Sequence, residues 1–316
     1  MKVVKFKING EYNIDFTLKP SFVSSLYKRE EKYYWIKHIG LNARAIFLKQ
    51  VNDYLKVFMS CEIDHEIILY ESGLWDDKPS SRISKLSGSL KEQIKALSEI
   101  FPGVRISIAP HDFNCIFIAS VLSKRANYEM VRRWMKDLWE KWKCNIEVIA
   151  KLSEIKGSYQ LMDLIKTMRD YLKLSNKSND VNELRRMLML CWGVGPKVAD
   201  ATLLFTTKSP WIVPCDIHLY KISKRLGWID CDVRLPKKAL CLKYWCEECI
   251  NKYGPCLREA ISELFPSFGG WIQTLTYLFG SSICKTYKPK CYLCHSILRE
   301  YCRAKSLKEK FLKEKF

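Results

Sequence analysis

The sequence is short of acidic side chains for its number of basic ones. It has 34 aspartates and glutamates against 53 lysines and arginines, which gives a formal net charge of +19 over 316 residues. This excess excludes a protein with an acidic surface and favours a polyanionic partner, either a nucleic acid or an acidic membrane surface. A lysine-rich solvated surface of the thermophile type is the alternative interpretation of the count.

Long hydrophobic runs are also missing. The longest apolar stretch, residues 113–122, has ten residues and is too short to cross a bilayer. The first residues alternate lysine with apolar side chains, and they have no pattern of a secretion signal. We therefore expect a soluble intracellular protein with no membrane partner.

Cysteines are sparse in the first part of the chain and dense in the last. Nine of the fourteen follow residue 230. A secreted disulfide scaffold would spread its cysteines along the chain, so clustering in an intracellular protein favours metal binding. One set has gaps of six, two and seven residues and comprises Cys284, Cys291, Cys294 and Cys302. Four clustered thiolates suit either an iron–sulfur cluster or zinc.

A second cysteine set lies earlier in the chain. It has gaps of four, two and six residues and comprises Cys241, Cys246, Cys249 and Cys256. Three interpretations remain open for it: a second metal ion, disulfides in a hyperthermophilic host, or buried thiols.

The first 60 residues have the two-residue alternation of strands. Strands are expected over residues 2–8, 12–18, 33–39, 45–51 and 54–60, with Asn9-Gly10 as a hairpin turn between the first two. From about residue 63 the period becomes helical. Residues 230–256 are expected to be irregular and residues 305–316 to form a solvated helix. The main helices are expected over residues 89–101, 113–122, 128–142, 159–172, 181–191, 196–206, 216–226 and 270–279.

Two glycines precede one of these helices. Gly193 and Gly195 flank Val194, and Pro196 follows at the first helical position, where proline is well tolerated. Glycine permits positive φ and close approach of the backbone to a partner. The free amides and the helix dipole at this end attract an anion. The turn therefore predicts a contact with a DNA phosphate that does not read sequence.

Lys197 and Asp216 add reactive groups to this turn. Lys197 lies in the first helical turn, where the helix dipole disfavours a cation. It is a candidate amine nucleophile if its pKa is lowered, and a simple phosphate contact is the alternative. Asp216 follows 19 residues later at the start of another expected helix. It can cap that helix and also place a carboxylate beside the lysine.

These residues carry a family resemblance. Residues 187–228 resemble the helix-hairpin-helix motif and the catalytic loop of the helix-hairpin-helix (HhH-GPD) DNA glycosylase superfamily. In that family a lysine at the position of Lys197 attacks the sugar C1′ and expels the damaged base, and an aspartate stands at the position of Asp216. Members with the lysine also cut the strand by β-elimination. The resemblance implies a bifunctional DNA glycosylase and AP lyase of base excision repair.

A second segment resembles the 8-oxoguanine group of that superfamily. Residues 270–277 resemble a segment of that group in which a glutamine reads the guanine edge and an aromatic ring stacks on the flipped base. The resemblance implies these roles for Gln273 and Tyr277. A base taken out of the duplex needs such a reader and such a clamp. Ordinary helix packing is the alternative interpretation of Gln273 and Tyr277. Ala201 is expected on the other side of the clamp. The early sheet and residues 108–117 also resemble this group.

The sequence departs from the family pattern in two places. The glycine that senses the N7 hydrogen of 8-oxoguanine has no clear match near residues 20–26, and Ser123-Lys124-Arg125 replaces an asparagine run. Arg125 is the candidate for filling the gap left by the flipped base, or for a phosphate contact. His218 is expected near the phosphate path rather than at a metal. The lesion and the opposite base therefore stay open.

The last cysteine set follows the helix of Gln273, as in endonuclease III, where the gaps are six, two and five residues. The resemblance implies that Cys284, Cys291, Cys294 and Cys302 ligate a [4Fe–4S] cluster, with zinc as the alternative. Lysines 285, 288 and 290 between the first two ligands are placed to meet DNA phosphates.

Together these features predict an α+β fold in three parts. Residues 1–88 form an antiparallel β domain, residues 89–282 a mainly helical glycosylase core with the helix-hairpin-helix at 185–207, and residues 283–316 a cysteine loop with a basic tail. The expected protein is a cytoplasmic, nucleoid-associated monomer that removes an oxidised purine from double-stranded DNA. The alternatives are an endonuclease III-like enzyme for damaged pyrimidines or for deaminated or mismatched bases, and a non-catalytic DNA-binding module.

Overall fold

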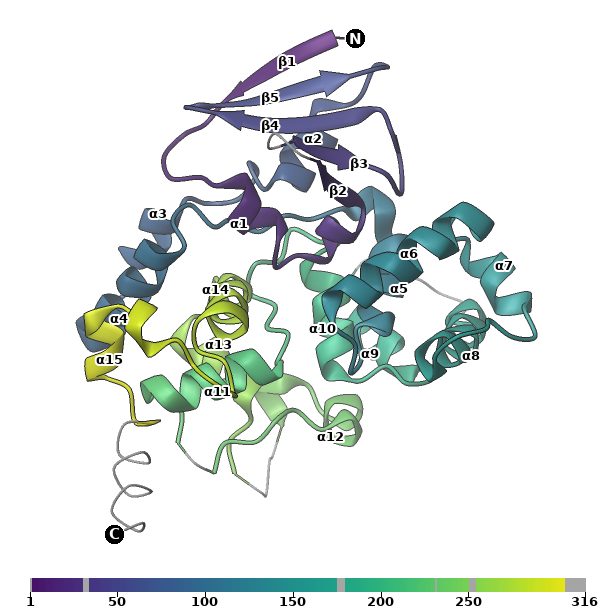
Figure 1. Cartoon of the computed structure of the whole chain (residues 1–316). Helices are drawn as coiled ribbons and strands as arrows, with labels where there is room; N and C mark the ends of the chain where they lie inside the picture. The colour runs from purple at the N-terminus through teal and green to yellow at the C-terminus, as the bar shows by residue number, and fades with distance from the viewer. Residues whose placement is uncertain (1, 31–33, 175–179, 231, 250–253, 305–316) are drawn as a thin grey trace.

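The computed structural model describes residues 2–30, 34–174, 180–230, 232–249 and 254–304. A sheet forms one end of the molecule, and the helices lie below it in two groups (Figure 1). Helices α5 to α10 form one group, and the other contains α4, α11 and α13 to α15. Among the described residues, no helix is both long enough and apolar enough to span a membrane.

The sheet has five antiparallel strands in the order β1-β5-β4-β3-β2. Alternate residues such as Leu48, Leu55 and Val57 are buried on one face, as the two-residue period predicts. Four of the five expected strands are confirmed to within two residues at each end, and β2 was not expected. The strands are β1 (Lys2–Lys7), β2 (Tyr27–Glu30), β3 (Tyr34–Lys37), β4 (Ile46–Val51) and β5 (Tyr54–Met59).

The strand expected over residues 12–18 is wrong, and with it the hairpin at Asn9-Gly10. This segment forms helix α1 (Ile14–Leu18), and β1 pairs with β5 instead. The Asn13 side chain caps the helix by accepting a hydrogen bond from the Phe16 amide at 3.0 Å. Asparagine is among the best residues for this role. Ile14 and Leu18, which are four residues apart, are buried on one side of the helix. Residues at this spacing would also share one face of a strand.

The expected helices are confirmed to within three residues at each end. Residues 230–256, expected to be irregular, contain a short helix, α12, and the expected tail helix lies outside the described residues. The helices are α2 (His65–Ser72), α3 (Pro79–Ile83), α4 (Gly88–Ile100), α5 (Phe113–Leu122), α6 (Tyr128–Trp142), α7 (Ile146–Lys151), α8 (Tyr159–Lys173), α9 (Val181–Leu190), α10 (Pro196–Leu204), α11 (Ile217–Leu226), α12 (Lys238–Lys243), α13 (Leu257–Leu264), α14 (Gly269–Ser282) and α15 (Ser296–Glu300).

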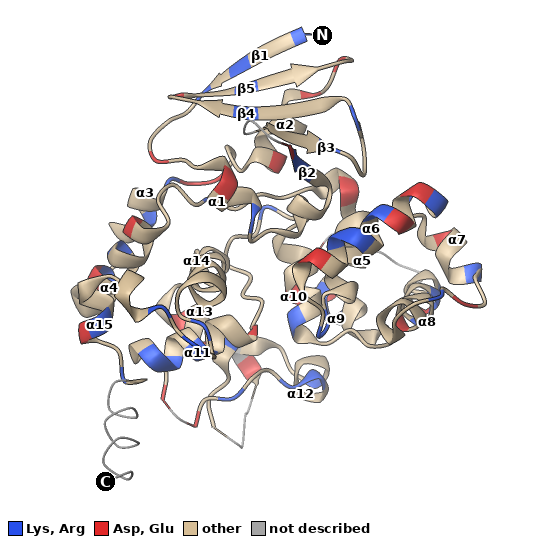
Figure 2. Cartoon of the chain, viewed as in Figure 1, with Lys and Arg blue, Asp and Glu red and all other residues tan. Residues whose placement is uncertain are grey.

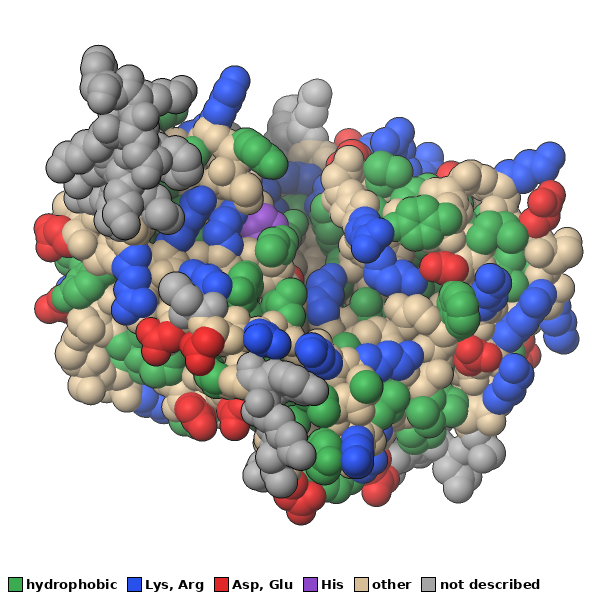
Figure 3. Space-filling view, turned by 90° about the horizontal axis from the view of Figure 1, so that it is seen from below, with side chains coloured by type: hydrophobic (Ala, Val, Ile, Leu, Met, Phe, Trp, Pro, Cys, Tyr) green, Lys and Arg blue, Asp and Glu red, His purple; other side chains and the backbone are tan. Residues whose placement is uncertain are grey.

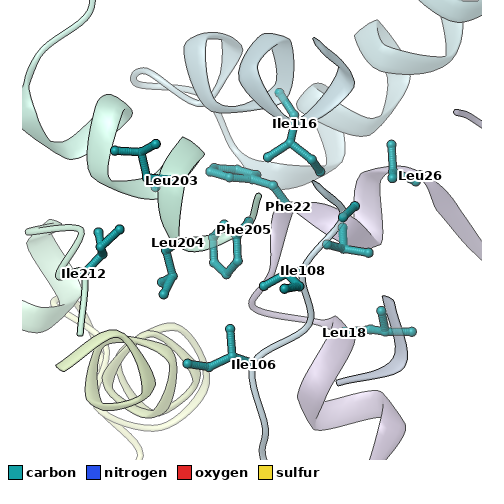
Figure 4. Close-up of a cluster of buried hydrophobic side chains, with 14 of the residues drawn as sticks. Leu18, Phe22, Leu26, Ile106, Ile108, Ile116, Leu203, Leu204, Phe205 and Ile212 are labelled. Atoms are coloured by element: carbon teal, nitrogen blue, oxygen red, sulfur yellow. The ribbon is translucent and has the colours of Figure 1, made fainter. Parts of the chain in front are cut away.

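The sheet part and the helical part share one hydrophobic core. At their junction the 3-10 turn η1 (Phe22–Ser25) packs against α5. The Phe22 ring meets the Phe205 ring edge-on, with centroids 5.7 Å apart, and Ile108 and Ile116 lie beside them (Figure 4). Because the first part of the chain supplies Phe22 to this junction, it helps to set the position of the end of α10, the helix that carries Lys197.

Candidate functional site

The turn between α9 and α10 has the geometry expected of an anion-binding hairpin. Gly193 has φ 66°, in the left-handed region that favours glycine. Val194 is fully buried and anchors the turn in the core. Gly195 precedes α10, no side chain caps that helix start, and Pro196 is its first residue. Open space surrounds the Cα of Gly195, so a phosphate can approach the backbone there.

Lys197 is half-buried in the first turn of α10. Its Nζ donates a hydrogen bond to Ser123 Oγ at 2.8 Å and lies 5.4 Å from the centre of the Phe22 ring. Burial lowers the pKa of Lys197 below its ordinary value, and the charge of Asp216 acts in the opposite direction. A lowered pKa makes the neutral, nucleophilic amine more accessible.

Asp216 caps the start of α11, as expected. Its Oδ1 accepts a hydrogen bond from the Leu219 amide at 2.7 Å. Its Oδ2 accepts one from Gln273 Nε2 at 3.0 Å, which links α11 to α14. Among the described ion pairs, none joins Asp216 to Lys197, although its charge acts on the lysine. The carboxylate is therefore held by the helix cap and by Gln273, close enough for its charge to act on the amine.

Gln273 and Tyr277 lie one turn apart on α14, where it packs on α11. Gln273 is 7% exposed. The Tyr277 ring meets the His218 ring edge-on, with centroids 5.2 Å apart. Burial raises the pKa of Tyr277 and Asp216 adds to the rise. The structure thus brings Gln273, Tyr277 and His218 together around Asp216.

Two other expected site residues lie on other elements. Ala201 is one turn beyond Lys197 on α10 and is only 2% exposed. Arg125 is exposed in the connection between α5 and α6, with φ 52°. The site is lined by both helical groups, since Lys197 lies in one and Asp216 in the other (Figure 1).

In the sequence, Ser123 and Lys124 are notable only because they replace an asparagine run of the family. In the structure, both lie beside the hairpin. Ser123 holds the Lys197 amine. The Lys124 ammonium lies next to Gly193, so close that a Cβ there would be 2.5 Å from its Nζ. Asp163 pairs with Lys124 at 3.5 Å. No local pattern in the sequence signals these partners, because 74 positions separate Ser123 from Lys197.

Basic side chains surround the site. Lys and Arg residues are prominent on α6 and α11 (Figure 2). Seen from below, basic side chains gather on both sides of a hollow near the centre of the face (Figure 3). The lysines at 285, 288 and 290 in the loop after α14 are all exposed. Such a surface fits a duplex whose backbone carries one charge per phosphate.

Four cysteines meet behind this loop. Cys284, Cys291, Cys294 and Cys302 line one cavity of about 320 Å³, together with apolar side chains such as Leu298. Burial and the neighbouring thiols raise the pKa of Cys294 to about 11, and Arg225 Nη1 lies 2.9 Å from Cys284 Sγ. Among the described residues, no three such side chains stand close enough to hold a single ion.

Comparison with known proteins adds relatives with named activities. No protein-family model matches the chain. It is 27% identical to endonuclease III of Thermotoga maritima over 203 residues, 59% of this chain and 81% of that protein. It is 29% identical to the N-glycosylase/DNA lyase of Saccharomyces cerevisiae over 149 residues, 40% of this chain and 39% of that protein.

A solved structure shares the fold over most of the chain. It is the Clostridium acetobutylicum 8-oxoguanine glycosylase/lyase in complex with double-stranded DNA containing cytosine opposite 8-oxoguanine. The TM-score is 0.64 at 15% identity, over 89% of this chain and 98% of that one. The order of a five-stranded antiparallel sheet, a helical core and a cysteine-rich end agrees with the α+β fold expected from the sequence.

Proposed function

We propose that the chain is a member of the helix-hairpin-helix DNA glycosylase superfamily and acts as a bifunctional glycosylase and AP lyase that removes 8-oxoguanine from double-stranded DNA. Glycosylase and lyase activity is supported by the names of its relatives. The observation that carries the assignment to residues is the half-buried amine of Lys197, whose pKa is lowered by burial and whose charge interacts with that of Asp216.

The proposed reaction begins at the Lys197 amine. Its nitrogen forms a bond to the sugar C1′ while the bond from C1′ to the base breaks, and the electron pair leaves with the base, which takes up a proton. The Asp216 carboxylate stabilises the positive charge that develops on the sugar. Opening of the sugar ring leaves a Schiff base on Lys197. Loss of a C2′ proton then breaks the bond from C3′ to its oxygen and cuts the strand.

Recognition of the base is assigned to α14. Gln273 would turn its amide from Asp216 toward the edge of the extruded guanine, and Tyr277 would stack on its face. Ala201 would line the opposite wall, and Arg125 would fill the gap in the duplex. The amides of the hairpin, with Val194 as its anchor, and His218 would contact the backbone on either side.

We also propose a [4Fe–4S] cluster at Cys284, Cys291, Cys294 and Cys302. The apolar cavity of about 320 Å³ that the four thiols line suits a four-iron cluster. Bound there, the cluster supplies a covalent link between separate loop segments. That link would hold the basic loop between Cys284 and Cys291 in front of the DNA backbone.

A borohydride trapping assay tests the nucleophile. The wild-type chain is expected to form a covalent adduct with a duplex that contains 8-oxoguanine. Lys197→Gln is expected to form none, because it has no amine to make the Schiff base. The control is Lys95→Gln, an exposed lysine whose surface pair with Glu99 spans 3.9 Å and contributes little to stability. An adduct in Lys197→Gln at the wild-type level would contradict the assignment.

The same assay, run over a panel of lesions, tests the substrate. A second candidate is a damaged pyrimidine, favoured by the likeness to an endonuclease III. Trapping is expected to be strongest with 8-oxoguanine. Stronger trapping with an oxidised pyrimidine would show that the proposed substrate is wrong, while the assignment of the nucleophile would stand. An absence of adduct and of strand cleavage on every duplex would leave only a DNA-binding module.

A further inference from the structure

The second cysteine set lies together in space, apart from the DNA site. Cys241 belongs to α12, Cys246 begins the 3-10 turn η3 (Cys246–Glu248), Cys249 follows that turn, and Cys256 precedes α13. Cys241, Cys249 and Cys256 line one cavity of about 20 Å³. Cys241 and Cys246 line the neighbouring cavity. Three chain segments thus bring four sulfur atoms to one place.

The backbone holds these cysteines in the manner of a metal-binding turn. The Cys249 amide donates to the Cys246 carbonyl at 3.4 Å, which closes the turn and gives a pair of cysteines two residues apart, the common spacing in zinc sites. The third segment is anchored separately. The Arg234 amide donates a hydrogen bond to the Pro255 carbonyl at 3.0 Å, and the Arg234 carbonyl accepts one from the Leu257 amide at 2.8 Å.

Two arginines contact the sulfur atoms. Arg185 Nη2 lies 3.8 Å from Cys241 Sγ, and Arg258 Nη1 contacts Cys246 Sγ. Both guanidinium groups also lie against buried Asp200, with Nε to carboxylate distances of 2.5 Å for Arg185 and 3.7 Å for Arg258. Buried Arg185 and half-buried Arg258 therefore place two positive charges beside the sulfur atoms.

We propose that Cys241, Cys246, Cys249 and Cys256 bind one Zn²⁺ ion in a closed tetrathiolate site. On binding, four thiols release four protons and form four sulfur–zinc bonds without any change of oxidation state, which leaves the site with a net charge of −2. Arg185 and Arg258 offset that charge. The described thiols are not yet gathered at ligand distances, so binding draws them together.

Three of the four thiols surround a space of the size of an ion. The cavity of about 20 Å³ among three of the thiols has room for roughly one water-sized particle. The cavity at the C-terminal set, about 320 Å³, is far larger. The fourth thiol, Cys246, lines the neighbouring cavity of about 410 Å³ together with Cys241.

The ion would also connect to the helices of the DNA site. Arg185 lies on α9 and Asp200 on α10, the two helices that flank the hairpin. Through these two residues, zinc would brace the hairpin from the side opposite the DNA. We assign it a structural role, because none of its ligands reaches Lys197 among the described contacts.

Metal content of the purified, reduced full chain tests the proposal. The wild type is expected to hold one zinc per chain after dialysis, separate from its iron. Cys249→Ser is expected to lose that zinc and keep the iron, whereas Cys291→Ser keeps the zinc. The matched control is Cys61→Ser, since Cys61 is exposed and lies outside both sets; it keeps both metals.

A measurement on the wild type covers the case in which Cys249→Ser does not fold. After removal of zinc, added Co²⁺ is expected to give the visible bands of a tetrahedral tetrathiolate site. Three results would overturn the proposal: no zinc and no such bands in the wild type, equal zinc in wild type and Cys249→Ser, or two disulfides within this set when thiols are counted in unfolded, unreduced protein.

Discussion

At the scale of single residues, the chemistry depends on how Lys197 is held. The helix start at Pro196 disfavours a cation, and burial acts in the same direction on its pKa. Asp216 acts against both. Its hydrogen bonds to the Leu219 amide and to Gln273 keep it in place. The balance between burial and one carboxylate therefore sets the pH at which the amine becomes neutral.

Asp216→Asn tests that balance. Asparagine caps a helix as well as aspartate does, so α11 is expected to stay folded. Loss of the carboxylate is expected to reduce base excision by about 10²- to 10⁴-fold, with DNA affinity unchanged. It also removes the interaction that raises the pKa of Lys197. The acid limb of the pH profile for borohydride trapping on a preformed abasic site should therefore move to lower pH.

A purely structural Asp216 would give a different result. In that case the variant would excise the base at the wild-type rate, and its pH profile would overlay that of the wild type. Either outcome removes the carboxylate from the mechanism.

At the scale of elements, the hairpin between α9 and α10 depends on a backbone conformation. Gly193 has φ 66°, and an L-residue with a side chain pays roughly 1–2 kcal/mol in this region. A side chain there also meets Lys124. The hairpin therefore requires glycine at position 193 for two reasons, the positive φ angle and the close approach of Lys124.

Gly193→Ala is expected to weaken binding to undamaged and damaged duplexes by the same factor, because the hairpin contacts phosphates rather than bases. Fluorescence anisotropy with both duplexes measures it. The matched control is Gly88→Ala at the start of α4, which has φ 55° and open space around its Cα. Both variants carry the same kind of backbone strain, so equal DNA affinities in the two would contradict a DNA contact at the hairpin.

At the scale of the whole molecule, the net charge of +19 is useful only where it meets DNA. Three exposed lysines lie in the loop between Cys284 and Cys291, and three others lie on the exposed strand β1 at the far end of the molecule (Figure 1). The two sets contribute equally to net charge. Only the first belongs to the loop that follows α14, the helix that carries Gln273 and Tyr277.

Neutralising each set separates local contact from overall charge. The triple variant Lys285→Gln, Lys288→Gln and Lys290→Gln is expected to lower the slope of log Kd against log salt concentration by about 1 for each phosphate that the loop no longer neutralises. The control triple variant replaces Lys2, Lys5 and Lys7 with glutamine and should leave the slope nearly unchanged. Equal changes in the two variants would show that net charge alone governs binding.

Much of the element structure could be predicted from local sequence. Apolar periodicity located the helices, since a helical face repeats within one segment. The glycine turn and the lysine after Pro196 identified the hairpin and the proposed nucleophile. The strand expected over residues 12–18 was wrong because Ile14 and Leu18 fit both periods, and the cap by Asn13 favoured the helix. A local apolar pattern cannot distinguish a helix from a strand where the spacing of its apolar residues fits both.

By itself the sequence determined which residues could be reactive: an amine, a carboxylate, a glutamine and two sets of four thiols. Only the tertiary structure decided what each of them faces. Ser123 reaches Lys197 across 74 positions, and Gln273 reaches Asp216 across 57. All four thiols of the later cysteine set line one cavity of about 320 Å³, whereas the thiols of the earlier set are divided between a cavity of about 20 Å³ and a neighbouring one. The physical reason is that burial and partners arise from packing between distant segments, which no local period records.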